Sequence, residues 1–230
     1  MLKYKHLFFD LDHTLWDFAT NEQNTLSHLF LKYGLDRYFE NFESFFKTYQ
    51  PINENLWLQY RNREVTKKYL SVNRFHHTFL TKGLNDATMA EQFGNDFITI
   101  NATQTALIPH TIEVLNYLEK KYTLHIITNG FAETQNVKLV GSGLSHYFKK
   151  IFISEQVGHP KPKRAFFEYA VKSSNARKSE SLVIGDNLEA DIIGAREFGL
   201  DQVFFNPQGT IHQEKVTKEI RSLKELMQWL

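Results

Sequence analysis

Acidic, hydroxyl, amide and basic side chains follow four separate short apolar runs of this 230-residue chain. The runs lead, in chain order, to Asp10 with Asp12, to Thr128-Asn129-Gly130, to Lys161 and to Asp186. In an open α/β sheet, ligands bind beyond the carboxyl ends of the strands. We therefore expect these side chains to meet at one edge of a sheet.

Carboxylates gathered at one edge raise one another's pKa and are costly to bury unless a cation neutralises them. A donor set of oxygen atoms that includes one or two carboxylates is typical of Mg²⁺. A phosphate would complete the set, because it bridges to the metal and accepts hydrogen bonds from groups such as Thr128, Asn129 and a lysine. An activated carboxylate beside Mg²⁺ predicts phosphoryl transfer through an aspartyl-phosphate.

The apolar runs themselves predict a parallel sheet, because they are continuous, as is usual when helices cover both faces. The predicted strands are residues 7–10, 124–128, 151–154, 182–185 and 202–205. Segments of helical period lie between or after the later runs, at 111–121, 165–173, 187–199 and 218–230. This alternation predicts a doubly wound α/β fold, a Rossmann-like core with five or more strands.

Residues 16–105 differ, because they contain almost no β-type run and several helical ones. The predicted helices are 21–33, 41–48, 53–69, 74–81 and 87–100, with breaks at Gly34, Pro51, Ser71-Val72-Asn73 and Gly83. A block of this size is far longer than a usual crossover. We therefore predict an inserted helical subdomain of residues 16–105 and an α/β core of residues 1–15 and 106–230.

Composition excludes several classes of protein. Lys and Arg total 27 and Asp and Glu 26. The chain therefore lacks the basic excess that would indicate a nucleic-acid polymer or an anionic membrane as partner. Cysteine is absent, which excludes disulfides, thiol nucleophiles and thiolate metal sites. Asp10 and Asp12 interrupt the first apolar run, so it cannot serve as the core of a signal peptide. We expect a soluble cytoplasmic protein with a small-molecule partner.

The ordered motifs resemble those of the haloacid dehalogenase (HAD) superfamily. Four motifs match in order: Asp10-x-Asp12-x-Thr14, Thr128, Lys161 and Gly185-Asp186-x-x-x-x-Asp191. The resemblance covers nearly the whole chain, and the helical insert is similar to the helical cap of that superfamily. Any one of these motifs is weak alone, but four in order, each after a predicted strand, are a strong signal.

The resemblance implies roles for the two carboxylates of the first motif. Asp10 is implied as the nucleophile that attacks phosphorus and as a ligand of Mg²⁺. Asp12 is implied as the general acid toward the leaving alcohol and then as the base for water, with its backbone carbonyl on the metal. The true dehalogenases lack a carboxylate at the position of Asp12 and need no metal. Since an alkoxide leaving group needs a proton, Asp12 favours a phosphatase.

The other motifs are implied to hold phosphate and metal. Thr128 and the backbone around Asn129 would bind phosphate oxygens, and Lys161 would stabilise charge on Asp10 and on the transferring group. Asp186 would be a metal ligand. Three further residues are implied as supporting: Asp191, which orders the metal's water shell or Lys161, together with Thr14 and Asn187.

The substrate class is a finer hypothesis. Residues 8–18 and Thr128-Asn129-Gly130-Phe131 resemble the HAD pyrimidine 5′-nucleotidases, which implies a nucleoside 5′-monophosphatase that prefers pyrimidines. The candidates for substrate contact are Trp16, Phe18, Trp57 and Tyr60, which could stack on a base, and His13. At the position of His13 the superfamily often has Gly, so its ring either lines the pocket or only tolerates the turn.

Several alternatives stay open at this level. A HAD phosphatase of sugar phosphates or of phosphoglycolate uses the same motifs, and a phosphomutase would hold a bisphosphate beneath the cap. A phosphoacceptor signalling domain also places Asp, Thr and Lys at the ends of a parallel sheet with Mg²⁺, but the large insert argues against it. The protein is expected to be a monomer or a homodimer.

Overall fold

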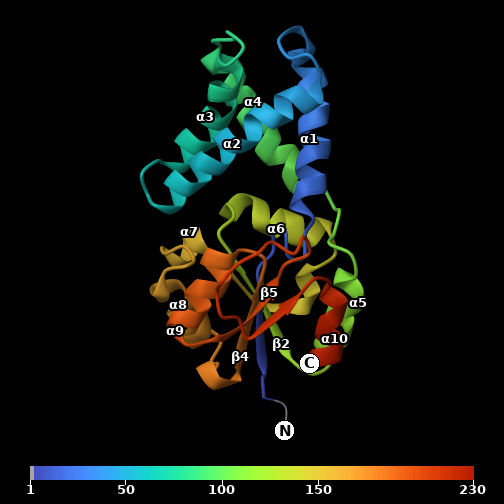
Figure 1. Cartoon of the computed structure of the whole chain (residues 1–230), viewed down its shortest axis with the longest axis vertical. Coiled ribbons are helices and arrows are strands. Elements are labelled where there is room, and N and C mark those ends of the chain that lie inside the picture. Colours follow the sequence, from blue (N-terminus) through green and yellow to red (C-terminus); the bar gives the residue numbers. More distant parts are fainter. Residues whose placement is uncertain (1–2) are drawn as a thin grey trace. The chain divides into compact units, whose positions relative to one another are not determined.

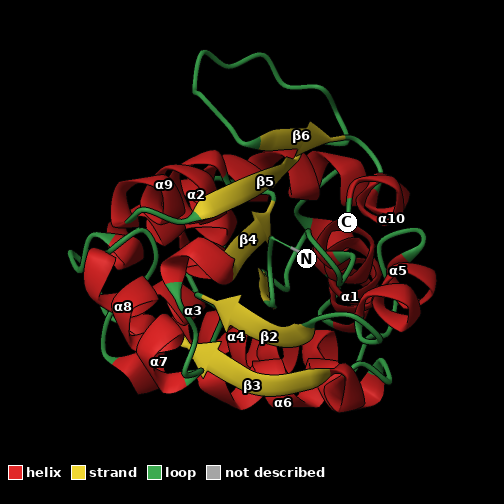
Figure 2. Ribbon diagram, turned by 90° about the horizontal axis from the view of Figure 1, so that it is seen from below, coloured by secondary structure: helices red, strands yellow, loops and turns green. Residues whose placement is uncertain are grey.

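The computed structural model describes residues 3–230, and its central element is a six-stranded parallel sheet. The strands are β1 (His6–Phe9), β2 (Thr123–Thr128), β3 (Phe148–Ile153), β4 (Ser181–Gly185), β5 (Asp201–Phe205) and β6 (Lys218–Ile220), and Figure 2 shows how they fan across the sheet. Their order is β3-β2-β1-β4-β5-β6, so β1 lies between β2 and β4. The predicted doubly wound α/β fold is confirmed.

Helices cover both faces of this sheet because successive side chains of each strand point to opposite faces. On one face, Leu7 and Phe9 share a hydrophobic cluster with α5 (Thr111–Leu118), α6 (Ala132–Gly141) and α10 (Leu226–Trp229). On the other face, Phe8 packs with α8 (Arg164–Ser173) and α9 (Gly194–Phe198), preceded by the short α7 (Ser154–Val157). Figure 1 shows α5 and α10 on one side of the strands and α8 and α9 on the other.

The C-terminal segment corrects one expectation. The single helix predicted over 218–230 is wrong, because its first residues form β6, which pairs with β5 and places Ile220 beside Phe205. Ser222 then starts a new turn through a capping box with Glu225. The apolar residues of this segment fit a helical period, but burying Ile220 in the sheet core decides the conformation.

The backbone of the structure divides into two compact units. One, the core unit, combines the chain up to Phe18 with Thr105–Leu230, and the other, the helical unit, is Ala19–Gln104. Four α-helices account for most of the helical unit: α1 (Phe18–Lys32), α2 (Phe42–Arg61), α3 (Lys67–Leu80) and α4 (Ala87–Ala102). They enclose a separate, phenylalanine-rich hydrophobic cluster. The helical unit therefore has a core of its own.

Two expected breaks in the helical unit are absent. Pro51 lies inside α2. The helix is buried through Phe45 and Tyr49 before the proline and through Leu56 after it, and this burial offsets the hydrogen bond that proline cannot make. Residues 71–73 lie inside α3, where the Ser71 hydroxyl and the Asn73 side-chain amide donate to carbonyls of their own helix. The predicted helix over 53–69 is likewise two helices, since α2 ends at Arg61 and α3 begins at Lys67.

Within the described residues 3–230, no helix is long and apolar enough to cross a membrane.

Candidate active site

The first motif forms a tight turn directly after the central strand β1. The backbone N–H of Asp10 donates to the carbonyl of Ile184 in β4 at 2.9 Å. The turn is closed by the N–H of Trp16, which donates to the carbonyl of Leu11 at 2.9 Å. His13 has φ 67°, a left-handed conformation that favours glycine. Its N–H donates to Trp16 O, so the turn itself requires this conformation. The motif therefore projects its carboxylates from the carboxyl end of the sheet.

A buried lysine ties the first motif to the third and the fourth. The Lys161 ammonium donates to Asp10 Oδ1 and to Asp191 Oδ1, each at 2.6 Å, and to the carbonyl of Ile127 at 3.0 Å. The Lys161 side chain is 2% exposed and that of Asp191 1%. The expectation that Asp191 supports Lys161 agrees with this contact.

This arrangement shifts the pKa values of its members. Burial lowers the pKa of Lys161, but the charges of Asp10 and Asp191 outweigh it and raise that pKa. Burial raises the pKa of Asp10 well above its usual range despite the nearby Lys161, and the charges of Asp191 and Asp186 add to this effect. Burial and the charge of Asp191 raise the pKa of Asp186 to about 6. One ammonium therefore does not neutralise three carboxylates.

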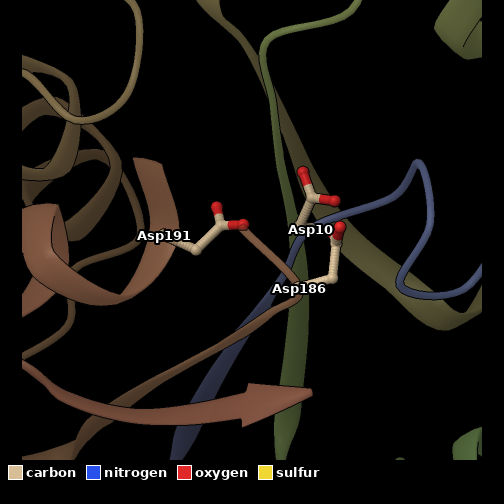
Figure 3. Close-up of side chains that lie close together, drawn as sticks. All are labelled: Asp10, Asp186 and Asp191. Carbon is tan, nitrogen blue, oxygen red and sulfur yellow. The ribbon is translucent and has the colours of Figure 1, made fainter. Parts of the chain in front are cut away.

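The three carboxylates form a cluster with the character of a cation site. Asp10, Asp186 and Asp191 each offer an oxygen, and these oxygens lie within 4.8 Å of one another. In Figure 3 the carboxylates of Asp10 and Asp186 lie side by side, and that of Asp191 reaches toward them. The Thr14 hydroxyl lies 2.9 Å from Asp186 Oδ1 and 3.2 Å from Asp10 Oδ2 and can donate to either. Hard oxygen donors with surplus negative charge fit a hard divalent cation.

The supporting residue Asn187 acts on the backbone. Its side-chain Oδ1 accepts from Ala190 N–H at 2.8 Å and so begins the π-helical turn Leu188–Ile193. Its own N–H donates to Asp191 Oδ2 at 3.2 Å. Asn187 therefore orients Asp191 rather than pointing an oxygen at the cluster.

The second motif lies at the end of β2 beside the lysine loop. The Asn129 side chain donates to the carbonyl of Lys161 and accepts from its N–H, both at 2.9 Å, which fixes the loop that carries the ammonium. A phosphate contact at Asn129 is therefore left to its backbone, as the resemblance implies. The Thr128 hydroxyl oxygen accepts from Gly130 N–H at 3.0 Å.

Two residues of α6 approach the second carboxylate of the first motif. Lys138 Nζ lies 2.5 Å from Asp12 Oδ1, and Gln135 Nε2 lies 2.9 Å from Asp12 Oδ2. Burial favours a higher pKa for Asp12, but the Lys138 charge and the two hydrogen bonds outweigh it and lower that pKa. The sequence reasoning missed both residues. The sequence does contain an indication of a buried Gln135, since a polar residue there lies four positions from Phe131 and four from Leu139, on an apolar helix face.

The predicted substrate-contact residues belong to both units: His13, Trp16 and Phe18 to the core unit, and Trp57 and Tyr60 to the helical unit. Trp16 is fully buried in the hydrophobic cluster of the core unit, so its indole offers no face for stacking, which corrects the expectation. Phe18 is partly buried, and its ring lies 4.9 Å from that of His13. Trp57 and Tyr60 belong to α2 of the helical unit, with ring centroids 5.7 Å apart.

Comparison with known proteins decides the family. The sequence-family model of the haloacid dehalogenase-like hydrolases matches residues 7–205 of this chain, which include all four motifs. The chain belongs to the haloacid dehalogenase-like hydrolases. The recognition from sequence motifs is thereby confirmed, as is the expectation that the protein is an enzyme.

Individual relatives of this HAD hydrolase match over its full length. It is 32% identical to pyrimidine 5′-nucleotidase YjjG of Escherichia coli K12, over 100% of this chain and 99% of the relative. It is also 32% identical to pyrimidine 5′-nucleotidase PynA of Streptococcus pneumoniae R6, over 99% and 95%. The crystal structure of the HAD-hydrolase YfnB of Bacillus subtilis, bound to magnesium, superposes with a TM-score of 0.89 at 30% identity, covering 99% of each chain.

Proposed function

We propose that this HAD hydrolase is a Mg²⁺-dependent phosphomonoesterase that acts through an aspartyl-phosphate on nucleoside 5′-monophosphates, with a preference for pyrimidines. The observation that carries the proposal is the convergence of Asp10, Asp186 and Asp191 around one edge position, with the Lys161 ammonium on Asp10. A carboxylate held beside a fixed cation, at the end of the central strand, suits nucleophilic attack on phosphorus.

In the proposed first step Asp10 forms the bond to phosphorus and the ester oxygen leaves. Asp10 Oδ1 is held by Lys161 at 2.6 Å, so Oδ2 is the oxygen available for attack. Thr128 and the N–H groups after it would bind phosphate oxygens, in place of water. Lys161 would stay on Asp10 and offset the charge that the phosphate adds.

The proton of this step is assigned to Asp12. Lys138 and Gln135 favour the carboxylate form of Asp12 in the free enzyme, so Asp12 would take up a proton from solvent as the substrate binds. It would give this proton to the leaving alkoxide as the P–O bond breaks. In the second step the resulting carboxylate would take a proton from the water that attacks phosphorus. The bond between Asp10 and phosphorus then breaks, and inorganic phosphate leaves. General acid–base catalysis of this kind contributes about 10²–10⁴-fold to the rate.

Mg²⁺, when bound, would neutralise the negative charge that Lys161 leaves uncompensated in the acidic cluster, together with that of the phosphate oxygens. Asp10 and Asp186 would hold it with their carboxylates, and the carbonyl of Asp12 would supply a further oxygen. Asp191 would act through Lys161, because its Oδ1 accepts a hydrogen bond from the Lys161 ammonium at 2.6 Å.

The substrate class is supported by the relatives and by the motif surroundings. Two relatives that match over nearly the full length are named pyrimidine 5′-nucleotidases. The segments at 8–18 and 128–131 resemble the same group. The helical unit has a hydrophobic core of its own, as expected of a cap that carries leaving-group specificity.

A substrate panel tests the proposal. Release of phosphate is measured with Mg²⁺ and with EDTA for UMP, dUMP, AMP, a hexose phosphate and phosphoglycolate, and Asp10→Asn serves as the control. We expect the highest kcat/KM for the pyrimidine nucleotides, no release in EDTA and none by Asp10→Asn. Faster turnover of a sugar phosphate or phosphoglycolate would overturn the substrate class. A stable phospho-Asp10 without turnover would instead show a phosphoacceptor domain.

A further inference from the structure

Both oxygens of the Asp12 carboxylate are held by one helix turn of α6. Gln135 and Lys138 are three residues apart, so they lie on the same helix face. Lys138 Nζ approaches Asp12 Oδ1 at 2.5 Å, and Gln135 Nε2 approaches Oδ2 at 2.9 Å. Gln135 is fully buried and Lys138 is 4% exposed. With an ammonium on one oxygen and an amide on the other, the carboxylate cannot rotate without losing a buried hydrogen bond.

Gln135 also reaches the phosphate-binding motif. Its Nε2 lies 2.5 Å from Thr128 Oγ1, and the two hydrogens of the amide can serve Thr128 and Asp12 at once. Gly130 makes this approach possible, because a Cβ there would lie 2.0 Å from Gln135 Nε2 and 3.1 Å from Asp12 Oδ2. One side chain therefore sets the separation between the proposed acid and the proposed phosphate binder.

Lys138 is itself fixed by aromatic rings. Its Nζ lies 4.3 Å from the centroid of the Trp16 ring and 5.1 Å from that of Phe18. A cation over the face of an aromatic ring is attracted by the ring quadrupole, more strongly where water is excluded. This contact gives the buried Trp16 a function other than the stacking on a base expected from sequence. The ammonium has little freedom to leave Asp12.

We propose that Gln135 and Lys138 are positioning residues of the hydrolase, which hold the Asp12 carboxyl in register with the phosphate site at Thr128 during proton transfer to the leaving group. The proposal rests on the proposed function, in which Asp12 protonates the leaving oxygen. Neither residue is assigned a contact with substrate, so their removal acts on kcat rather than on KM. A displacement of about 1 Å in such a group can cost on the order of 10²-fold in rate.

The dependence of kcat on the leaving group distinguishes a positioning role from a merely structural one, because a structural defect would lower kcat equally for all leaving groups. A nucleoside 5′-monophosphate releases an alkoxide that needs a proton, whereas p-nitrophenyl phosphate releases a phenolate that needs none. The variants are Lys138→Met and Gln135→Ala, each measured on dUMP and on p-nitrophenyl phosphate with Mg²⁺. Asn136→Ala is the matched control, since Asn136 lies on the exposed face of the same helix.

We expect Lys138→Met to lower kcat for dUMP by about tenfold or more with KM unchanged, and to lower kcat for p-nitrophenyl phosphate by less than about twofold. Gln135→Ala also releases Thr128, so it should lower kcat for both substrates, with a loss about tenfold larger for dUMP. Added to Asp12→Asn, Lys138→Met should cause no further loss on dUMP, because the group that it positions is gone. Asn136→Ala should behave as the unchanged enzyme with both substrates.

The outcomes separate this proposal from the one on which it rests. Equal losses on the two substrates, or a loss in KM alone, would overturn the positioning role. If Asp12→Asn itself fails to distinguish the two leaving groups, the proposed acid role of Asp12 fails first. Thermal unfolding of each variant shows whether it folds, and Gln135→Ala, which removes no charge, decides the question if Lys138→Met does not fold.

Discussion

The Lys161 ammonium donates to Asp10 Oδ1 at 2.6 Å, and both groups are buried. The same ammonium holds Asp191 at 2.6 Å, so one lysine lies between two carboxylates that would otherwise repel each other. A buried charge without its partner is costly, because neither water nor another group compensates it. Lys161 therefore contributes to folding as well as to the proposed chemistry.

Lys161→Met should lower the free energy of unfolding by about 3–5 kcal/mol at pH 7.5, the usual cost of removing one partner of a buried pair. The loss should be smaller at pH 5, since burial already raises the pKa of Asp10, which then becomes neutral by protonation. Urea unfolding at the two pH values measures both effects.

Lys172→Met is the matched control, because Lys172 forms an exposed ion pair with Glu168 on the surface of α8. Such a pair contributes little, so no measurable change in stability is expected. A Lys161→Met protein as stable as the Lys172→Met protein would contradict the prediction.

Magnesium binding should weaken as the pH falls, because the cluster must release protons to bind a cation. The pKa of Asp186 is raised to about 6, so below pH 6 protons compete with the metal. For one competing proton the affinity falls by up to about tenfold per pH unit. Titration calorimetry between pH 5 and 7.5 measures this, and Asp186→Asn should bind more weakly at pH 7.5.

The control for the metal prediction is Asp201→Asn. Asp201 pairs with Lys3 and accepts from Tyr4 at 2.9 Å, and it is no member of the acidic cluster. Its removal should leave Mg²⁺ affinity and its pH dependence unchanged. An affinity that is equal at pH 5 and pH 7.5 would show that the cluster is not the binding site.

Gly185 is required because Asp191 occupies the place of a side chain. A Cβ at Gly185 would lie 2.4 Å from Asp191 Oδ2 and 2.5 Å from its Cγ. Gly185→Ala should therefore push Asp191 away from Lys161 and cost about 1–3 kcal/mol, as overpacking does. Thermal or urea unfolding measures the loss, and kcat should fall with it.

Gly141→Ala provides the comparison, since a Cβ at that last residue of α6 would meet no atom of residues 3–230 within 4 Å. Alanine is a better helix former than glycine, so this variant should be as stable as the unchanged protein or more stable by up to about 1 kcal/mol. Equal stabilities of Gly185→Ala and Gly141→Ala would show that Asp191 moves freely.

The sequence predicts the strands and the motif residues well, because both are local signals. A continuous apolar run bounded by polar residues requires nothing from the rest of the chain, and the residue after each run lies at the ligand edge. Asp10, Lys161 and Asp186 therefore fall where their positions in sequence place them. The five predicted strands are found, each within three residues of its expected start.

What the sequence does not predict depends on tertiary contacts. Ile220 joins the sheet because β5 offers an open edge, and Pro51 stays helical because its neighbours are buried on one face. Gln135 and Lys138 are ordinary helix residues by type, and their contacts with Asp12 and Thr128 are what support the proposed positioning role. Local propensity gives no information on such partners.

His125 should make the stability of the protein depend on pH, because its imidazole is buried within strand β2 of the sheet. Its ring stacks on Phe8 at 4.8 Å, its Nε2 lies 3.1 Å from His6 Nδ1, and its Nδ1 has no partner within residues 3–230. Burial, with smaller effects of the His6 and Lys150 charges, lowers its pKa to about 4. The native state thus resists a proton that the unfolded chain accepts near pH 6.5.

The sign of the pH dependence follows from this difference. Between pH 6.5 and pH 4 the unfolded chain binds one proton more at His125 than the native protein, so stability rises with pH and is lost as the pH falls through this window. The shift corresponds to about 3 kcal/mol. In His125→Phe, with a ring that can still stack on Phe8, urea unfolding in EDTA should lose less stability between pH 7 and pH 4.5 than in the unchanged protein. Parallel stability curves for the two proteins would show that His125 accepts its proton in the native state.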